Sequence, residues 1–185
     1  ALRDCPALIE PGRSLLGAAQ ERWLAGSWDA RRPWNLLAQQ TLMAPLNWPA
    51  PEGLHWTDGW DGYPAARARL LRDLAAAGVP NAVVLGGDVH ANYVAELRGP
   101  APDGPLLASE FCGTSISSQG LAQACVDRLL ADNPQLLYGR SDERGYMRFE
   151  LGAGGLQAEL RRVAEPWNPR SAVQAGARFV VEAGR

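Results

Sequence analysis

The stretch Asn81-Ala-Val-Val-Leu-Gly-Gly-Asp-Val-His-Ala-Asn92 decides how the rest of the chain is interpreted. Residues 82–85 form an unbroken apolar run between a proline and two glycines, which predicts a short buried strand. The glycines allow a tight turn after the strand. Asp88 and His90 follow two residues apart, and in an extended chain their side chains project to the same face, with Val89 turned into the packing.

Two interpretations of Asp88 and His90 follow from this pattern. In the first, the pair is a turn carboxylate beside a hydrogen-bonded histidine. In the second, it is a metal or catalytic site at the end of a strand, where a rigid sheet fixes the ligands and a loop exposes them. We favour the second, because the chain has only two histidines and this one follows a Gly-Gly pair that no packing pattern requires.

Length and charge exclude several classes of protein. A chain of 185 residues is long enough for one domain with a full core and too short for two. The net charge of -2 provides no basic patch for nucleic acid or for an anionic membrane. No window of 18 apolar residues is present, so no transmembrane segment is predicted, and the first residues do not resemble a signal peptide.

The three cysteines, Cys5, Cys112 and Cys125, are too few and too widely spaced for a disulfide framework or a zinc site. Two alternatives remain for Cys112 and Cys125: a single bridge between them, or buried free thiols.

The N-terminal third is predicted to contain a lead-in segment and one helix. Residues 1–12 carry two prolines and little periodicity. Residues 14–26 have one apolar stripe at helical spacing, with Gly17 as a candidate cap and Gln20 in the capping-box position. Residues 34–46 form a second amphipathic stretch whose ends the pattern does not define.

Residues 47–63 are rich in proline, glycine and tryptophan and are expected to form a long loop. Its three large aromatic side chains argue against disorder, so the loop either fills the edge of the core or lines a cleft. The clearest helix follows at 64–77, with proline in its first turn and Gly78 just past its end.

The C-terminal half is predicted to be mainly β-structure. Strands are expected at 93–97 and 106–112, and a helix at 121–131. The hydroxyl-rich run at 113–120 between them has three possible uses: it caps the helix, contacts a phosphate or simply turns the chain, and we favour capping. Apolar alternation then predicts three closing antiparallel strands, at 145–151, 156–163 and 177–182.

These features together resemble the C-terminal half of a PhoD-type alkaline phosphatase, a branch of the calcineurin-like metallophosphoesterases. The order and spacing of the matching residues cover almost everything from Arg13 onward. They are Leu16-Gly-x-x-Gln-x-x-Trp-Leu24, Trp34 through Gln39-Gln40 and Met43, Trp60-Asp-Gly-Tyr63, Arg67, Gly87-Asp-Val-His90, Glu110, Ser115-Ile-Ser-Ser118, Arg144-Gly-Tyr146 and Phe179-Val-Val-Glu182.

The resemblance implies an α/β (α+β) fold, the C-terminal half of an αββα sandwich. Such a half has a mixed sheet, flanking helices and closing antiparallel strands. It also implies a binuclear metal centre, in which His90 binds iron(III) and Asp88 binds a neighbouring divalent ion, calcium in this family's pattern. The donor types agree, because carboxylate oxygen suits a hard cation and neutral imidazole suits a transition metal.

The activity that the resemblance implies is metal-assisted hydrolysis of a phosphate mono- or diester. Asp88 and His90 are then the catalytic and metal-ligating candidates. Asp61, Tyr63 and Arg67 match family positions near the cleft and are the candidates for substrate binding. Asp61 has a structural alternative, which is to cap the helix at 64–77.

The chain departs from the family pattern in one respect: it has no segment for the ligand turns that precede the matching region. We therefore expect residues 1–185 to be a single partial domain whose metal centre is incomplete and which is inactive without the missing N-terminal half. The surface left uncovered would allow a homodimer. A non-catalytic binding or assembly domain on the same scaffold is the alternative. Family resemblance alone suggests a periplasmic or secreted protein.

Overall fold

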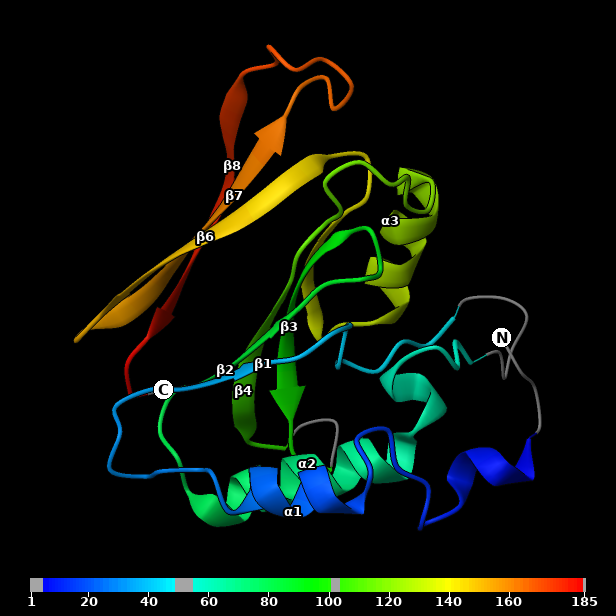
Figure 1. The fold of residues 1–185 in the computed structure, drawn as a ribbon, viewed down its shortest axis with the longest axis vertical. Helices are drawn as coiled ribbons and strands as arrows, with labels where there is room; N and C mark the ends of the chain where they lie inside the picture. The colour runs from blue at the N-terminus through cyan, green and yellow to red at the C-terminus, as the bar shows by residue number, and fades with distance from the viewer. Residues whose placement is uncertain (1–4, 49–54, 101–103, 185) are drawn as a thin grey trace.

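The structure is a computed structural model that describes residues 5–48, 55–100 and 104–184 (Figure 1). The helices in these ranges are η1 (Pro6–Ile9), α1 (Ala18–Ala25), η2 (Trp60–Gly62), α2 (Pro64–Ala77) and α3 (Gln123–Asp132). The strands are β1 (Asn35–Ala38), β2 (Ala82–Gly86), β3 (Asn92–Arg98), β4 (Leu106–Cys112), β5 (Leu136–Arg140), β6 (Arg144–Gly152), β7 (Gly155–Val163) and β8 (Val173–Glu182). No membrane-spanning helix is found among these residues.

The larger sheet has five strands in the order β1-β2-β4-β3-β5. The neighbours β1, β2 and β4 run parallel, whereas β3 is antiparallel to both β4 and β5. The predicted mixed sheet is therefore confirmed. Because β1, β2 and β4 are parallel, their carboxyl ends and the turns that follow them meet at one edge of the sheet.

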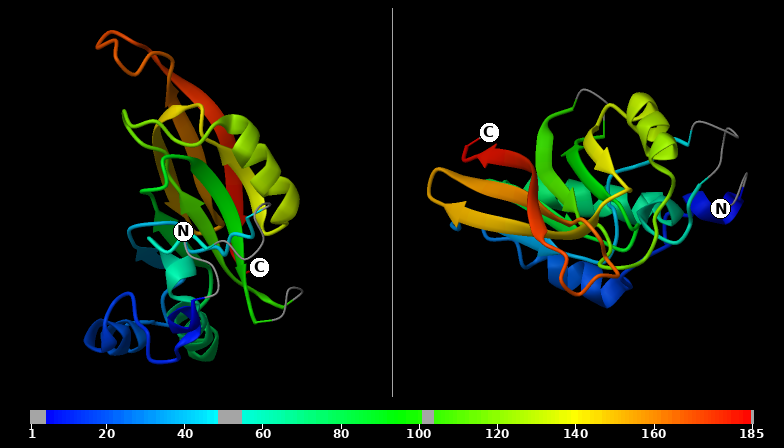
Figure 2. Two further views of the ribbon diagram at one scale, coloured as in Figure 1. Left: turned by 90° about the vertical axis from the view of Figure 1, so that its right-hand side faces the viewer. Right: turned by 90° about the horizontal axis from the view of Figure 1, so that it is seen from above.

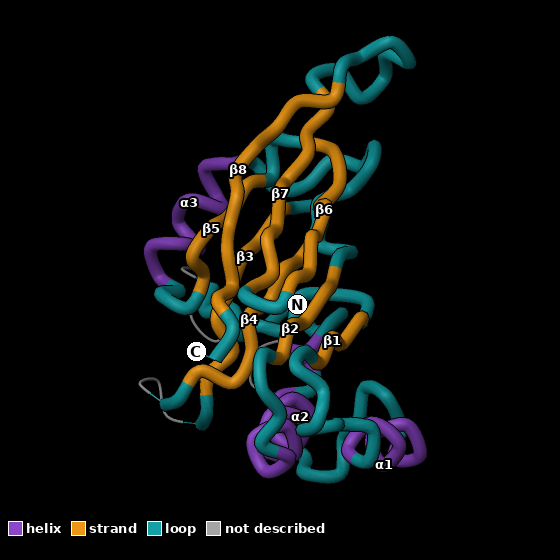
Figure 3. Tube along the Cα trace, turned by 90° about the vertical axis from the view of Figure 1, so that its left-hand side faces the viewer, coloured by secondary structure: helices purple, strands orange, loops and turns teal. Residues whose placement is uncertain are grey.

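The second sheet, in the order β6-β7-β8, is antiparallel as predicted and is stacked on the first (Figures 2 and 3). An apolar layer joins the two sheets. Val83 and Phe111 of the larger sheet belong to the same buried cluster as Leu156 and Ala158 of the smaller one. The ring of Phe111 also meets that of Phe149 edge-on, with 5.4 Å between the centroids.

The helices pack on the opposite face of the larger sheet. Strand residues such as Val84 and Ala95 share a second buried cluster with Leu70 and Leu74 of α2 and with Val126 of α3. The layers are therefore helices, five-stranded sheet and three-stranded sheet. These are three of the four layers of the αββα arrangement that the resemblance implies.

Helix α2 has the predicted bounds, and local sequence explains both ends. Pro64 occupies the first turn, where its missing N–H is not needed. Gly78 follows the last residue with φ 58°, a left-handed conformation that glycine adopts without steric cost.

Helix α1 is shorter than predicted, because it begins at Ala18 rather than near residue 14. Gly17 is the N-cap residue, as predicted, and its φ of 81° interrupts the helical conformation there. The capping-box role of Gln20 is wrong, because the Gly17 N–H that Gln20 would accept in a capping box has another partner. Instead, Ser14 Oγ accepts a hydrogen bond from the Gly17 N–H at 2.7 Å.

Three further predictions are corrected or supplemented by tertiary contacts. The amphipathic stretch at 34–46 is a four-residue strand, β1, followed by a turn. Strand β5, which contains Gly139, has no counterpart among the predicted strands. A side chain there would meet Val126 at 2.8 Å, so the glycine reflects the packing of α3. All three cysteines are free, so a Cys112–Cys125 bridge is wrong. The buried free thiol is confirmed for Cys112, whereas Cys125 is free but only partly buried.

Gly86, the first glycine of the Gly-Gly pair, has a packing role after all. A β-carbon at this position would lie 2.3 Å from the carbonyl oxygen of Thr41, in the turn that follows β1. The turn after β1 therefore lies directly against the end of β2.

Gly86→Ala is expected to lower the free energy of unfolding by about 1–3 kcal/mol, because backbone on both sides must shift to admit the methyl group. Gly113→Ala is the matched control, since a β-carbon there has its nearest contact at an ordinary 3.8 Å. Chemical denaturation of both variants measures the difference. Equal stabilities would contradict the close approach at Gly86.

Candidate metal centre

Three turns meet at the carboxyl edge of the parallel strands. They comprise residues 39–41 after β1, 87–91 after β2 and 113–120 after β4. Backbone hydrogen bonds join them: the Gly87 N–H donates to the Gln40 carbonyl at 3.1 Å, and the Gly113 N–H donates to the Gly86 carbonyl at 2.9 Å. In open sheets of this kind, ligands bind outside the carboxyl ends of the strands.

Asp88 and His90 lie in the middle turn, but the chain is not extended there as predicted. Their φ angles are 69° and 56°, both left-handed. Non-glycine residues held in this way cost about 1–3 kcal/mol each and cluster at functional sites. Asp and His tolerate the conformation better than most residues, which explains why this turn can form. Val89 between them packs against the helix-side core, as expected.

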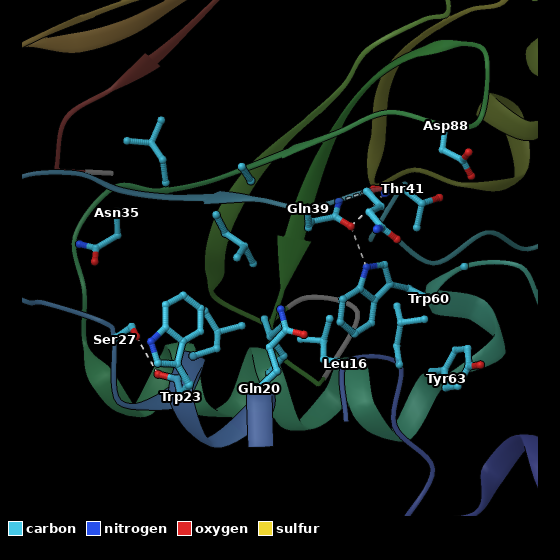
Figure 4. A pocket seen from close by; sticks show the side chains of 18 of the residues that line it. Leu16, Gln20, Trp23, Ser27, Asn35, Gln39, Thr41, Trp60, Tyr63 and Asp88 are labelled. Atoms are coloured by element: carbon cyan, nitrogen blue, oxygen red, sulfur yellow. Dashed lines mark hydrogen bonds between the residues drawn. The ribbon is translucent and has the colours of Figure 1, made fainter. Parts of the chain in front are cut away.

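The Asp88 side chain is exposed and lies at one end of a large open cleft (Figure 4). Gln39, Thr41, Trp60 and Tyr63 line the same cleft, and the Trp60 indole donates to Gln39 Oε1 at 3.0 Å. Within the described part of the chain, the Asp88 carboxylate has no hydrogen-bond or ion-pair partner. Both of its oxygens are therefore available to a cation.

His90 is half-buried in the same turn and is not among the residues that line this cleft. Its Nδ1 atom lies 3.0 Å from the carbonyl oxygen of Gln119, in the turn after β4. The other ring nitrogen, Nε2, makes no hydrogen bond to the described residues.

The donor set fits the implied metals in type but not in number. A free carboxylate and an imidazole nitrogen are the ligands expected for a hard divalent ion and a transition metal. Among residues 5–48, 55–100 and 104–184, however, no group of three or more His, Cys, Asp and Glu side chains could hold a metal ion. These two residues can supply only part of a coordination shell.

Asp61 and Arg67 form an ion pair away from Asp88. Asp61 Oδ1 and Arg67 Nη1 are 2.5 Å apart, with 10% and 13% of the respective side chains exposed. Asp61 Oδ2 accepts the Leu46 N–H at 3.0 Å, so the alternative that Asp61 caps α2 is wrong. Neither residue lines the cleft that contains Asp88.

Tyr63 is the one substrate-binding candidate that lies in the cleft with Asp88 (Figure 4). The Arg13 guanidinium stacks over its ring, 4.4 Å from the centroid.

Glu110 occupies the centre of β4, and its structural role was not foreseen. It is fully buried and accepts the N–H groups of Met43 and Ala44 at 2.6 and 2.7 Å. Burial raises the pKa of Glu110 to about 7, although these two N–H groups and the Arg67 charge favour the carboxylate. The sequence offered two signals: Glu110 matches a family position, and it lies within a predicted strand directly before the apolar residues Phe111 and Cys112.

Glu110 is expected to make stability depend on pH. Because folding raises its pKa above the ordinary 4.5, the native protein keeps a proton that the unfolded chain releases. The unfolding free energy should therefore fall as pH rises from about 4.5 to about 7, as measured by denaturant titration across that range.

Glu110→Gln should remove most of this slope, whereas Glu159→Gln should leave it in place. Glu159 is a suitable control because hydrogen bonds from Arg178 and Arg161 lower its pKa, so it titrates below this range. A slope that persists in Glu110→Gln would contradict the assignment.

Arg67→Met is expected to lower the unfolding free energy by about 3 kcal/mol, because it leaves the Asp61 carboxylate buried without its cation. Arg31→Met provides the comparison, since Arg31 pairs with Asp29 on the surface and its loss should change stability little. Equal effects in urea denaturation would show that the Asp61–Arg67 pair does not stabilise the fold.

Three comparisons place the chain among known proteins. A sequence model of the family described as PhoD-like phosphatase matches residues 2–160. Alkaline phosphatase D of Bacillus subtilis (strain 168) is 35% identical over 181 residues, covering 93% of this chain and 30% of that protein. A solved structure described as "Structure of PhoD" superposes with a TM-score of 0.85 at 34% identity, covering 93% of this chain and 34% of that one.

The chain therefore spans about a third of the length of these relatives. The residues that the family model matches include the whole five-stranded sheet, the turns at its carboxyl edge and β6 of the second sheet. This chain belongs to the PhoD-like phosphatase family.

Proposed function

We propose that this chain supplies two ligands, Asp88 and His90, to the binuclear metal centre of a phosphate ester hydrolase. The observation that carries the proposal is the strained turn after β2. There, a carboxylate without a partner among the described residues and an imidazole two positions later lie at the edge where sheets of this type bind ligands.

The two residues would have different tasks. The Asp88 carboxylate would hold a divalent ion, calcium by family resemblance, and the His90 imidazole would hold iron(III). When bound, such a pair of ions neutralises the phosphoryl oxygens and activates water at neutral pH. The left-handed backbone keeps both side chains on one short turn. The two ligands are therefore already ordered by the folded protein before a metal binds.

The remaining ligands would come from polypeptide outside residues 1–185. Membership of the family supports a phosphatase-type function, and the chain covers only part of the relatives that carry that name. We therefore assign hydrolysis of phosphate mono- or diesters to the complete protein and propose that residues 1–185 alone are inactive.

Of the substrate-binding candidates, we retain Tyr63 as a cleft residue beside Asp88. Asp61 and Arg67 would contribute indirectly, because their charged groups are paired with each other and with the backbone of residues 43–46. They would support the turn after β1 rather than touch the phosphate.

Asp88→Ala and His90→Ala are each expected to reduce metal content and to lower hydrolysis of bis-(p-nitrophenyl) phosphate by more than about 100-fold in the complete gene product. The reason is that substituting a residue that only hydrogen-bonds to a metal ligand already lowers metal affinity or activity by about 10–100-fold. Elemental analysis and steady-state kinetics measure the two effects.

His55→Gln and Asp132→Asn are the matched controls, since His55 is the other histidine and Asp132 is an exposed carboxylate at the end of α3. Both should retain metal and activity. If the Asp88 and His90 variants behave like these controls, the ligand assignment fails. A complete gene product without metal or hydrolysis would instead favour the non-catalytic scaffold.

A further inference from the structure

We infer that the turn after β4, residues 113–120, is a positioning element that fixes which nitrogen of His90 is free to bind a metal. This inference rests on the proposed function for the role of His90. Its structural content, the protonation and orientation of the ring, can be measured without any metal.

The hydrogen bond from His90 to Gln119 determines the tautomer. A carbonyl oxygen can only accept, so the Nδ1 atom that lies 3.0 Å from it must carry the hydrogen. In the neutral ring the lone pair is then on Nε2, which has no partner among the described residues. Metal-binding histidines are commonly oriented in this way by a hydrogen bond at the second nitrogen.

Gly120 allows the turn to approach His90 closely enough for this bond. A β-carbon at Gly120 would lie 2.3 Å from the carbonyl oxygen of His90. Because that atom belongs to the backbone, any side chain at position 120 would force one of the two segments to move. Gly120 is therefore a positioning residue, because it acts on His90 only through the fit between two backbone segments.

The turn is anchored at its other end by Asn92, the first residue of β3. Asn92 is 3% exposed, and its Oδ1 accepts the Thr114 N–H at 3.0 Å. The Thr114 hydroxyl donates to the Glu143 carbonyl at 2.9 Å, and the Ser115 carbonyl accepts the Gly145 N–H at 3.2 Å.

These anchors connect His90 to both sheets. Asn92 belongs to the five-stranded sheet, whereas Gly145 belongs to β6 of the three-stranded sheet. The orientation of the imidazole thus depends on the two sheets being stacked correctly, although no side chain of the smaller sheet is itself a ligand candidate in this site.

The test is a long-range ¹H–¹⁵N correlation spectrum of the metal-free protein, recorded over a pH series that reaches the neutral ring. The chain has only two histidines, so His55→Gln assigns the His90 signals directly. We expect hydrogen on Nδ1 and an unprotonated Nε2 for His90. Hydrogen on Nε2 in the unaltered protein would overturn the inference.

Gly120→Ala should release the ring into a mixture of tautomers, and Gly154→Ala should not, because a β-carbon at Gly154 meets nothing within 4 Å. Should Gly120→Ala not fold, Asn92→Leu removes the anchor for Thr114, while Asn92→Asp keeps an acceptor and should preserve the tautomer. An unchanged His90 tautomer in both Gly120→Ala and Asn92→Leu would overturn the inference.

Metal titration separates this inference from the proposed function. In the complete gene product, Gly120→Ala should weaken metal binding by about 10–100-fold, as expected for loss of a group that orients a ligand. Metal affinity equal to that of the unaltered protein would overturn the positioning role. Failure of the unaltered protein to bind metal would overturn the proposed function and leave the tautomer result standing.

Discussion

The Glu110 carboxylate, buried at the centre of β4, holds the backbone of Met43 and Ala44 through two short hydrogen bonds. A buried carboxylate is costly unless its oxygens are satisfied. These two N–H groups offset part of that cost, and burial still raises the pKa of Glu110 to about 7. The same bonds supply acceptors for the N–H groups of Met43 and Ala44, which lie outside any strand. These hydrogen bonds hold the segment after β1 against the helix-side face of the sheet.

Other side chains hold the rest of that segment. Asp61 accepts the Leu46 N–H, Arg67 donates to the Met43 carbonyl, and Asn133 bonds to both the N–H and the carbonyl of Asn47. These three residues lie in η2, in α2 and directly after α3. An irregular segment can be buried here because side chains distant in sequence satisfy its backbone.

The hydrogen bonds of Glu110, Asp61, Arg67 and Asn133 matter for the site, because the segment after β1 that they hold lies against β2. Thr41 fills the space beside Gly86, and Gln40 accepts the Gly87 N–H, so both glycines before Asp88 are held in place. On the other side, the turn after β4 lies against His90. The left-handed conformations at Asp88 and His90 are thus maintained by packing from both neighbouring turns, as strained residues require.

Local sequence was sufficient to place a helix or strand wherever the determining residues lie within that element. Proline and glycine set the ends of α2, alternation placed β6, β7 and β8, and the run before Gly86 placed β2. Residue type also singled out Asp88 and His90. Tertiary structure alone decided the left-handed turn that carries them, the short strand β1, the strand β5, and the use of Glu110 and Asp61 as acceptors for a distant backbone. The reason is physical: each of these depends on hydrogen bonds or steric contacts between segments far apart in the chain, which no local pattern of residues contains.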